Sequence, residues 1–435
     1  MMLGLIYAGI AVVSILVTCQ SAHTLYLTLY TWGRPPSEAR APDWLMPPRL
    51  SFTVMLPARH EEAVIQTTIA RVAEANYPAD LIQVLVICSA DDEGTISQAE
   101  EKIAELRQEG LDGLSLIVFR DGPVNKPHGL NAGLPHAAND VITIFDAEDD
   151  IHPDVFNVVN TVMEHEQVKV VQAGVQLMNF DSSWYSALNV LEYFFWFKSR
   201  LHYHARRGVI PLGGNTVFFE RGLITGIGGW DERNLTEDAE IGLRLSAAGE
   251  RIRVVYDARY VTREETPPTL GQFMRQRTRW SQGFMQTLRK GTWRNLPTRR
   301  QRWLAFSTLA FPHAQALLAI YVLFSVATML AIKAPVLVAL ISFLPVLMLL
   351  AHFLISVVGL YEFARTYDVT ASPRDVVRMA IAWIPFQLVV SFAALRALGR
   401  QLRGVNNWEK TSHIGAHRMP VGGIEGLREV TERAA

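Results

Sequence analysis

The sequence is poor in charge and in cysteine. Only 19% of its 435 residues are charged and 49% are hydrophobic, whereas a soluble protein carries about 25% charged residues. With 41 Lys and Arg against 42 Asp and Glu, the formal net charge is −1, which gives no overall electrostatic case for nucleic-acid binding. Cys19 and Cys88 are too few for a disulfide framework or a cysteine metal cluster. The composition therefore indicates a folded, membrane-associated protein.

Long stretches without charge predict where the membrane segments lie, because a spanning helix needs about 20 apolar residues. Residues 1–33 contain no Asp, Glu, Lys or Arg, which predicts an N-terminal transmembrane helix. No basic residue precedes this stretch, so a cleaved signal peptide is not favoured. Arg34, Arg40 and Arg49 follow it, and basic residues favour the cytoplasmic side of a membrane. We therefore expect an integral protein of a bacterial inner or plasma membrane, with the next domain in the cytoplasm.

Three more apolar stretches lie in the C-terminal third. Residues 303–363 form two of them, separated by Lys333, and predict a transmembrane hairpin. The third, inside residues 374–403, has an uncharged core of only 17 residues, Met379–Leu395, interrupted by Pro385. Basic residues flank both of its ends, which favours an interfacial or re-entrant helix over a crossing one. Residues 404–435 then form a cytoplasmic tail.

Residues 50–265 alternate apolar runs with amphipathic stretches, which is typical of an α/β domain with a mainly parallel sheet. The expected strands are Phe52–Leu56, Gln83–Cys88, Ser115–Phe119 and Val141–Phe145. In an open α/β sheet, ligands bind beyond the carboxyl ends of the strands. Residues that directly follow each strand are therefore the candidates for a functional site.

The first two strand ends carry polar turns. The first can hold a nucleoside, or it can be a plain proline turn before a helix. Taken alone, the acids of the second would cap the next helix. The candidates are Pro57, Ala58, Arg59 and Glu61 after the first strand, and Asp91 and Asp92 after the second.

The next two strand ends carry charge. Lys126 stands beside Gly129 and Gly133 at a helix start, a plausible cradle for a diphosphate. The fourth strand is followed by four carboxylates in five residues, from Asp146 to Asp150. Crowded carboxylates repel one another, and Mg²⁺ or Mn²⁺ is the usual reason to hold them together. A solvated acidic turn is the alternative.

Two motifs follow further along the chain. Thr236, Glu237 and Asp238 open an amphipathic stretch, where the acids could simply cap a helix. Residues 266–302 contain nine Lys or Arg, no Asp or Glu, and interleaved aromatics. An interfacial helix whose basic side chains reach the headgroups explains that charge. It does not explain why one Gln, two Arg and one Trp fall within Gln276–Trp280.

Taken together and in this order, these motifs resemble the membrane-embedded family 2 glycosyltransferases, which include cellulose, chitin and hyaluronan synthases. The resemblance implies a GT-A (Rossmann-like) nucleotide-sugar-binding domain inserted between transmembrane helices. It covers residues 50 to about 300 and rests on Pro57 to Glu61, Lys126 with Leu130 and Asn131, Asp146 to Glu148, Thr236 to Asp238, and Gln276 to Trp280. A stretch from Trp408 to His413, including Thr411, resembles the gating loop of the synthases.

The resemblance also implies roles. Asp146 and Glu148 would hold Mg²⁺ or Mn²⁺ against the leaving diphosphate, with Lys126 as a further positive contact. Asp238, beside Glu237, would be the catalytic base. The nucleotide and the donor sugar would contact the turn at Pro57 to Glu61, Asp91 or Asp92, Gly214 and Asn215. The acceptor and the diphosphate would contact Gln276, Arg277, Arg279 and Trp280. Trp408 and Thr411 would belong to a loop that gates the active site.

The implied function is an inverting, metal-dependent hexosyl transfer from a nucleotide sugar, with UDP-sugar expected, to a growing β-linked polysaccharide at the membrane. The alternative within enzymes is transfer of one sugar to a lipid acceptor, such as a polyprenyl phosphate or a glycolipid. A non-catalytic membrane scaffold or transporter is a third possibility, against which the acidic motifs argue. The expected partners are the nucleotide sugar, a glycan or lipid acceptor and the membrane, without nucleic acid.

Overall fold

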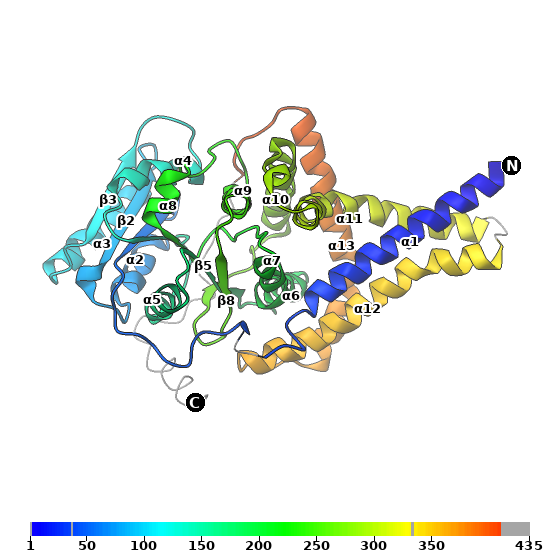
Figure 1. Cartoon of the computed structure of the whole chain (residues 1–435), viewed down its shortest axis with the longest axis horizontal. Coiled ribbons are helices and arrows are strands. Elements are labelled where there is room, and N and C mark those ends of the chain that lie inside the picture. The colour runs from blue at the N-terminus through cyan, green and yellow to red at the C-terminus, as the bar shows by residue number, and fades with distance from the viewer. Residues whose placement is uncertain (1, 36–37, 332–334, 410–435) are drawn as a thin grey trace.

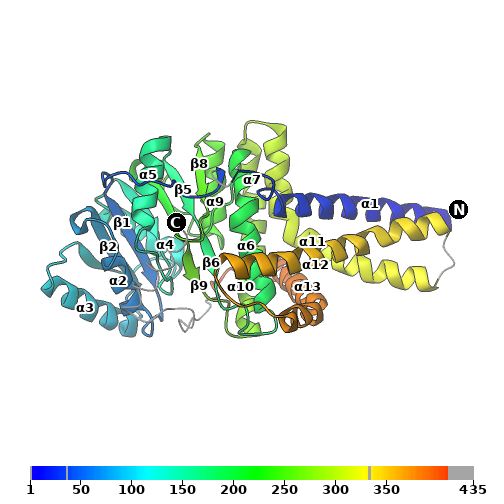
Figure 2. The same ribbon diagram turned by 90° about the horizontal axis from the view of Figure 1, so that it is seen from below.

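The computed structural model describes residues 2–35, 38–331 and 335–409. An α/β domain forms one end of the molecule and long helices project from it (Figure 1). Figure 2, turned by 90°, shows that α1 (Met2–Thr28), α11 (Arg299–Ala331) and α12 (Val336–Thr366) run side by side away from the domain. The N-terminal helix and the first two of the three C-terminal apolar stretches thus pack on one another.

The α/β domain is built on a seven-stranded sheet in the order β3-β2-β1-β4-β7-β5-β8. Neighbouring strands are parallel except around β7, which is antiparallel to both β4 and β5. The expected α/β class is confirmed, and all four expected strands form with ends shifted by up to two residues. The strands are β1 Phe52–Ala58, β2 Ile82–Ser89, β3 Leu114–Phe119, β4 Val141–Ile144, β5 Val170–Ala173, β7 Val217–Glu220 and β8 Ile252–Val255, with a separate pair of β6 Val175–Leu177 and β9 Thr262–Glu264.

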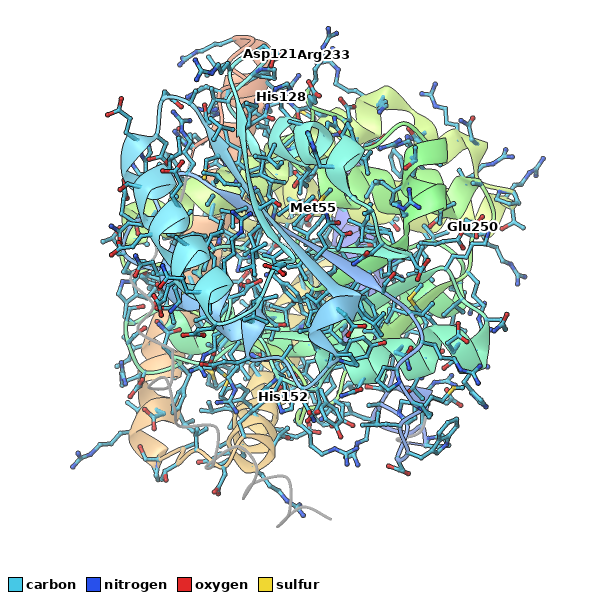
Figure 3. All side chains as sticks on the ribbon, turned by 90° about the vertical axis from the view of Figure 1, so that its left-hand side faces the viewer. Met55, Asp121, His128, His152, Arg233 and Glu250 are labelled. Carbon is cyan, nitrogen blue, oxygen red and sulfur yellow. The ribbon has the colours of Figure 1, made fainter. Side chains whose placement is uncertain are left out.

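Apolar side chains cover both faces of the sheet because helices pack on each side. Along β1, Phe52, Val54 and Leu56 join one buried cluster and Met55 joins the other, as the two-residue period of a strand requires. Figure 3 views the domain from its far end, with Met55 near the middle and Asp121, Arg233 and Glu250 at the rim. The helices are α2 Ile65–Ala73, α3 Glu93–Gln108, α4 Lys126–Gly133, α5 Val155–Glu166, α6 Ser186–Phe195, a π-helical turn η4 Trp196–Arg200, α7 Leu201–Arg206, α8 Arg221–Gly226, α9 Glu237–Ala247 and α10 Leu270–Lys290.

Within residues 2–35, 38–331 and 335–409, four helices are long and apolar enough to cross a membrane: α1, the first part of α11, α12 and α13 (Pro373–Leu402). In α13 the helix is longer than its 17-residue apolar core suggested, because Ser372 and Asp375 form a capping box at its start and it continues through Pro385. The proline therefore does not end the helix.

The direction of α13 differs from that of the other long helices (Figure 1). Near its start, Arg378 donates to the carbonyl of Asp181 at 3.1 Å, and near its end, Arg400 donates to Gln282 on α10 at 2.9 Å. Both ends of α13 thus contact the half of the chain that contains the sheet and α10. That arrangement suits a helix that lies along a membrane surface. That α13 does not cross the membrane stays a prediction.

Candidate active site

One cavity of about 990 Å³ begins at the carboxyl ends of β1 and β4 and continues between the long helices. It gathers nearly all the residues proposed from sequence. Asp91 and Asp92 are not among the residues that line it, and Thr411 lies outside the described residues. The predicted residues that do line it are Pro57, Ala58, Arg59, Glu61, Lys126, Asp146, Glu148, Gly214, Asn215, Glu237, Asp238, Gln276, Arg277, Arg279, Trp280 and Trp408.

The acidic turn after β4 divides its carboxylates between two directions. Asp146 and Glu148 line the cavity. Asp149 is buried, accepts from the backbone N–H of Asp146 at 2.8 Å, and accepts from the Asn215 amide at 2.8 and 2.9 Å. Burial, followed by the nearby charge of Glu264, raises the pKa of Asp149 well above its usual range. Asp149 therefore holds the turn in shape, and Asp146 and Glu148 are left facing the cavity.

Lys126 ties the acidic turn to the glycine turn before β7. Its ammonium group donates to Asp146 and to the carbonyl of Gly214, the latter at 2.9 Å. Burial by itself lowers the pKa of Lys126, but the charges of Asp146 and Glu237 outweigh burial and raise it. Lys126 is therefore a fixed positive charge in the cavity.

The oxygen donors of this turn suit a hard divalent cation. Carboxylates are the protein ligands that Mg²⁺ and Mn²⁺ prefer. Asp146 and Glu148 supply two of them on the cavity wall. Among the described lining residues, eight carboxylates face five cations, which are Arg59, Lys126, Arg200, Arg277 and Arg279. The residues present therefore fit the metal that the sequence predicts.

Asp238 stands on the first turn of α9, opposite Gly214. One carboxylate oxygen accepts from the backbone N–H of Ala239 at 2.7 Å. The other lies so close to Gly214 that a Cβ there would be 3.1 Å away. Burial raises the pKa of Asp238, partly offset by that hydrogen bond and by Lys126. Burial and the neighbouring Asp238 raise the pKa of Glu237 to about 8, so the pair sits where a carboxylate can exchange a proton near neutral pH.

Helix α10 packs directly against the turn that carries Asp238. A Cβ built on Gly283 would lie 2.5 Å from the Thr236 hydroxyl and 2.6 Å from its backbone nitrogen. The turn is also tied to α10 by Asn234, which donates to Thr287 at 2.8 Å. The missing side chain at Gly283 thus lets the two elements approach closely enough to fix the turn.

Replacing Gly283 with Ala should therefore displace Asp238 and lower kcat by about tenfold or more, with a smaller change in donor affinity. Gly271→Ala is the matched control, because it lies on the same helix and a Cβ there meets nothing within 4 Å. Steady-state kinetics of both variants, with circular dichroism to check folding, measures the difference. Equal activity of the two variants would contradict the packing argument.

The far wall of the cavity is formed by α10 and α6. Arg277 pairs with Glu192 and Asn189 of α6, and its guanidinium lies 4.9 Å from the ring of Trp280. Buried polar atoms that have no hydrogen-bond partner among the described residues include Gln276 Oε1, Arg277 Nε and Arg279 Nε. Such atoms are rare in native interiors unless a ligand or water satisfies them, and a binding role for this wall stays a prediction.

The start of the tail lies over this wall. The guanidinium of Arg279 is 4.5 Å from the ring of Trp408. Glu409 accepts from Arg396 at 2.6 and 2.7 Å and from Arg400 at 2.9 Å, so the segment is held on α13. Trp408 is thus placed in the cavity, whereas its proposed gating role stays a prediction.

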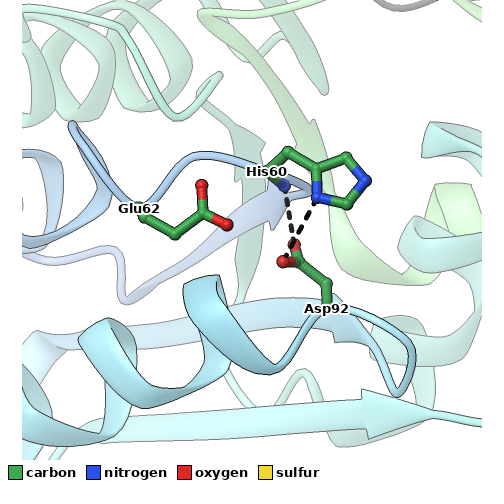
Figure 4. Close-up of side chains that lie close together, drawn as sticks. All are labelled: His60, Glu62 and Asp92. Atoms are coloured by element: carbon green, nitrogen blue, oxygen red, sulfur yellow. Dashed lines mark hydrogen bonds and ion pairs between the residues drawn. The ribbon is translucent and has the colours of Figure 1, made fainter.

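The turn after β1 is locked to the start of α3 (Figure 4). Asp92 accepts from the backbone N–H groups of His60 at 2.6 Å and Thr95 at 3.4 Å. Asp91 instead pairs with Arg59 at 3.2 Å and is half exposed. Ligand atoms of His60, Glu62 and Asp92 lie within 4.8 Å of one another. Because the Asp92 carboxylate already accepts hydrogen bonds from two backbone N–H groups, we assign no ion there. A base-binding role for Asp91 or Asp92 stays a prediction.

Sequence reasoning did not find the residues that α6 and the segment around β9 contribute. Asn189, Glu192 and Tyr193 line the cavity or touch its lining, as does Glu264. One signal was present in the sequence. Glu192 is the only acidic residue between Asp181 and Glu220, and an isolated acid in an apolar helix needs a partner.

Comparison with known proteins identifies the family. The profile described as "Glycosyltransferase like family 2" matches residues 47–283, which is more than half of the chain. The chain belongs to the family 2 glycosyltransferases. The match includes the Gln276–Trp280 motif on α10, which lies within the residues 50 to about 300 that carry the resemblance.

Two curated relatives differ in what their names describe. The chain is 26% identical over 237 residues to the beta-monoglucosyldiacylglycerol synthase of Nostoc sp., covering 54% of this chain and 49% of that one. It is 22% identical over 371 residues to the poly-beta-1,6-N-acetyl-D-glucosamine synthase of Staphylococcus epidermidis, covering 82% of this chain and 86% of that one. The chain spans about half the length of the first curated relatives it matches.

A solved structure shares the fold. The mannosyltransferase PcManGT from Pyrobaculum calidifontis, in complex with GDP-Man and Mn²⁺, aligns with a TM-score of 0.59 at 22% identity. The alignment covers 89% of this chain and 99% of that one. The GT-A fold predicted from the motifs is therefore confirmed.

Proposed function

We propose that the protein transfers a sugar, with inversion and with the help of Mg²⁺ or Mn²⁺, from a nucleotide sugar to a growing β-linked polysaccharide at the membrane. UDP-sugar is the expected donor. The observation that carries the proposal is the meeting of Asp238, Lys126 and the Asp146 turn in one cavity that continues between the long helices.

In this proposal, each residue has a separate role in a single displacement at the anomeric carbon. A divalent ion held by Asp146 and Glu148 would neutralise charge that grows on the diphosphate as the glycosidic bond breaks. Lys126 and Arg279 add positive charge on two sides of the cavity. Asp238 accepts the proton of the acceptor hydroxyl while the hydroxyl oxygen bonds to the anomeric carbon. The nucleoside diphosphate departs from the opposite face of that carbon.

A lipid acceptor is the second candidate, and the part of the cavity between the long helices favours it. Between the long helices the walls include Leu16 and Val17 of α1 and Leu349 and Ile355 of α12, which suit an acyl or prenyl chain. The name of the Nostoc relative describes a lipid product. The Gln276–Trp280 wall instead favours a sugar chain, because Trp280 offers an aromatic face on which a sugar ring can stack.

The test is a donor screen. Purified full-length protein in nanodiscs is incubated with a panel of UDP- and GDP-sugars and Mn²⁺, with and without added diacylglycerol or polyprenyl phosphate. Nucleotide release is measured and the products are analysed by mass spectrometry. A ladder of sugar oligomers supports a polysaccharide product, a single-sugar lipid supports the second candidate, and no release with any donor would contradict both.

The placement of α13 and Trp408 leads to a topology prediction: the tail lies on the same cytoplasmic side as the catalytic domain. Single cysteines at Ser97 and Ser412, after replacement of Cys19 and Cys88 by Ala, should both resist a membrane-impermeant thiol reagent in intact cells. Both should react in inverted vesicles. Labelling of position 412 from outside would show that α13 crosses the membrane and would separate the tail from the active site.

A further inference from the structure

A second cavity, of about 630 Å³, lies where α1 and α12 meet the α/β domain. None of its described lining residues is shared with the candidate active site. Its walls come from residues 30–35 and 38–40 after α1, from His202 and Arg206 of α7, from β8 at the edge of the sheet, and from Glu362 near the end of α12.

Positive charge dominates this second cavity. Three glutamates line it, and each is already paired: Glu38 with two arginines at 3.4 and 3.5 Å, Glu166 with two at 2.8 and 2.9 Å, and Glu362 with a lysine. Six cations against three carboxylates leave three positive charges in excess, which favours an anion. The cations are Arg34, Arg40, Lys198, Arg206, Arg251 and Arg253.

A buried histidine in the same lining has a ring nitrogen, Nε2, without a hydrogen-bond partner in the part of the chain that the structure describes. His202 is only 8% exposed, and its Nε2 atom makes no hydrogen bond to any described residue. Burial, and then the charge of Arg253, lower the pKa of His202 to about 3, so the imidazole is neutral. A neutral imidazole that carries its proton on Nε2 can donate one hydrogen bond to an anionic oxygen.

The position of the cavity indicates where that anion comes from. Tyr30 and Trp32, in the wall next to the end of α1, are residue types enriched at the membrane–water boundary. The guanidinium of Arg34 lies 4.2 Å from the Tyr30 ring. Since α1 and α12 are both candidate membrane helices, their domain-side ends fall at the depth of lipid headgroups. Basic pockets in that position bind anionic headgroups.

We propose that the second cavity binds the phosphate of an anionic phospholipid, with phosphatidylglycerol as the representative headgroup. The arginines supply charge-assisted hydrogen bonds to the phosphate oxygens, and His202 Nε2 supplies a further donor. The site would fasten the catalytic domain to the membrane surface beside α1 and α12. The inference is independent of the reaction proposed above.

The experiment measures lipid binding to the purified full-length protein in detergent by native mass spectrometry, titrating phosphatidylglycerol and phosphatidylcholine separately. Arg206→Ala with Arg251→Ala removes two exposed cations of the cavity, whose side chains are 59% and 68% exposed, so folding should be kept. The matched control is Arg299→Ala with Arg374→Ala, which removes two exposed arginines at the starts of α11 and α13. His202→Gln tests the buried donor separately.

We expect the natural sequence to prefer phosphatidylglycerol, the cavity variant to bind it at least about tenfold more weakly, and the control variant to bind within about twofold of the natural sequence. His202→Gln should lose part of the preference without a change in phosphatidylcholine binding. Equal weakening in both double variants, or no preference between the lipids, would overturn the proposal. Inorganic phosphate that displaces the lipid at equal concentration would identify a soluble-anion site and overturn the lipid assignment.

Discussion

Replacing Asp238 with Asn is expected to lower kcat by about 10²-fold or more while donor binding survives. The amide keeps the shape of the carboxylate and can still accept a hydrogen bond from the Ala239 N–H, but it cannot accept the proton of an acceptor hydroxyl. The measurement is single-turnover nucleotide release, with calorimetry of nucleotide binding. A near-normal rate would return Asp238 to a helix-capping role.

The stability of this variant separates the two interpretations further. Burial raises the pKa of Asp238 in the folded protein, so at pH 7 an ionised carboxylate there costs stability rather than adding it. The Asn variant should therefore melt at the same temperature as the natural sequence or above it. A lower melting temperature would mean that the carboxylate is structural.

The same raised pKa gives the expected pH dependence. A base works only when it has lost its proton, so kcat should fall as the pH decreases through the pKa of the Glu237 and Asp238 pair. Burial raises the pKa of both carboxyl groups, and the pKa of Glu237 reaches about 8. The fall in kcat should therefore begin at a higher pH than it would for an exposed aspartate. The Asp238→Asn variant should lack that limb of the profile.

Removal of the divalent ion is the second large effect we expect. EDTA should abolish turnover and Mg²⁺ or Mn²⁺ should restore it, because side chains such as Lys126 and Arg279 would otherwise be the only positive charge that stabilises the leaving diphosphate. Asp146→Asn should lower kcat by at least about 10²-fold and raise the metal concentration needed for half-maximal rate. Full activity in chelator would refute the metal assignment.

Asp150→Asn is the comparison for that prediction. Asp150 is buried and pairs with the buried Arg71 at 3.2 Å, away from the cavity lining. Breaking such a pair destabilises a protein by about 3–5 kcal/mol, so this variant should melt earlier but keep its metal dependence. Asp146→Asn also removes a partner of the partly buried Lys126, so it too should melt earlier. The two variants should differ in function, because only Asp146→Asn should lose activity and the response to metal.

The sequence was informative about the sheet and the strand-end motifs for a physical reason. Runs such as Val141–Ile144 are apolar and rich in β-branched residues, which suits a strand covered on both faces. The carboxyl ends of parallel strands then meet at one edge. This edge brings Lys126 and Asp146 together although 20 positions separate them.

What could not be predicted depends on contacts between distant segments. Asn215 is predicted to contact the donor sugar, and the sequence does not show that its amide also donates to Asp149. The hydrogen bond from the His60 backbone N–H to Asp92 could not be predicted either, and the base-binding role of Asp92 stays a prediction. Glu192 becomes part of the cavity only because α10 brings Arg277 against it. No local pattern contains these pairings.

The most direct test of the central claim is the anomeric configuration of the first product, followed by proton NMR during turnover with the donor that the screen identifies. A single displacement with Asp238 as base predicts that an α-linked nucleotide sugar gives a β-linked product from the first detectable turnover. An α-linked product would contradict a single displacement and remove the role assigned to Asp238.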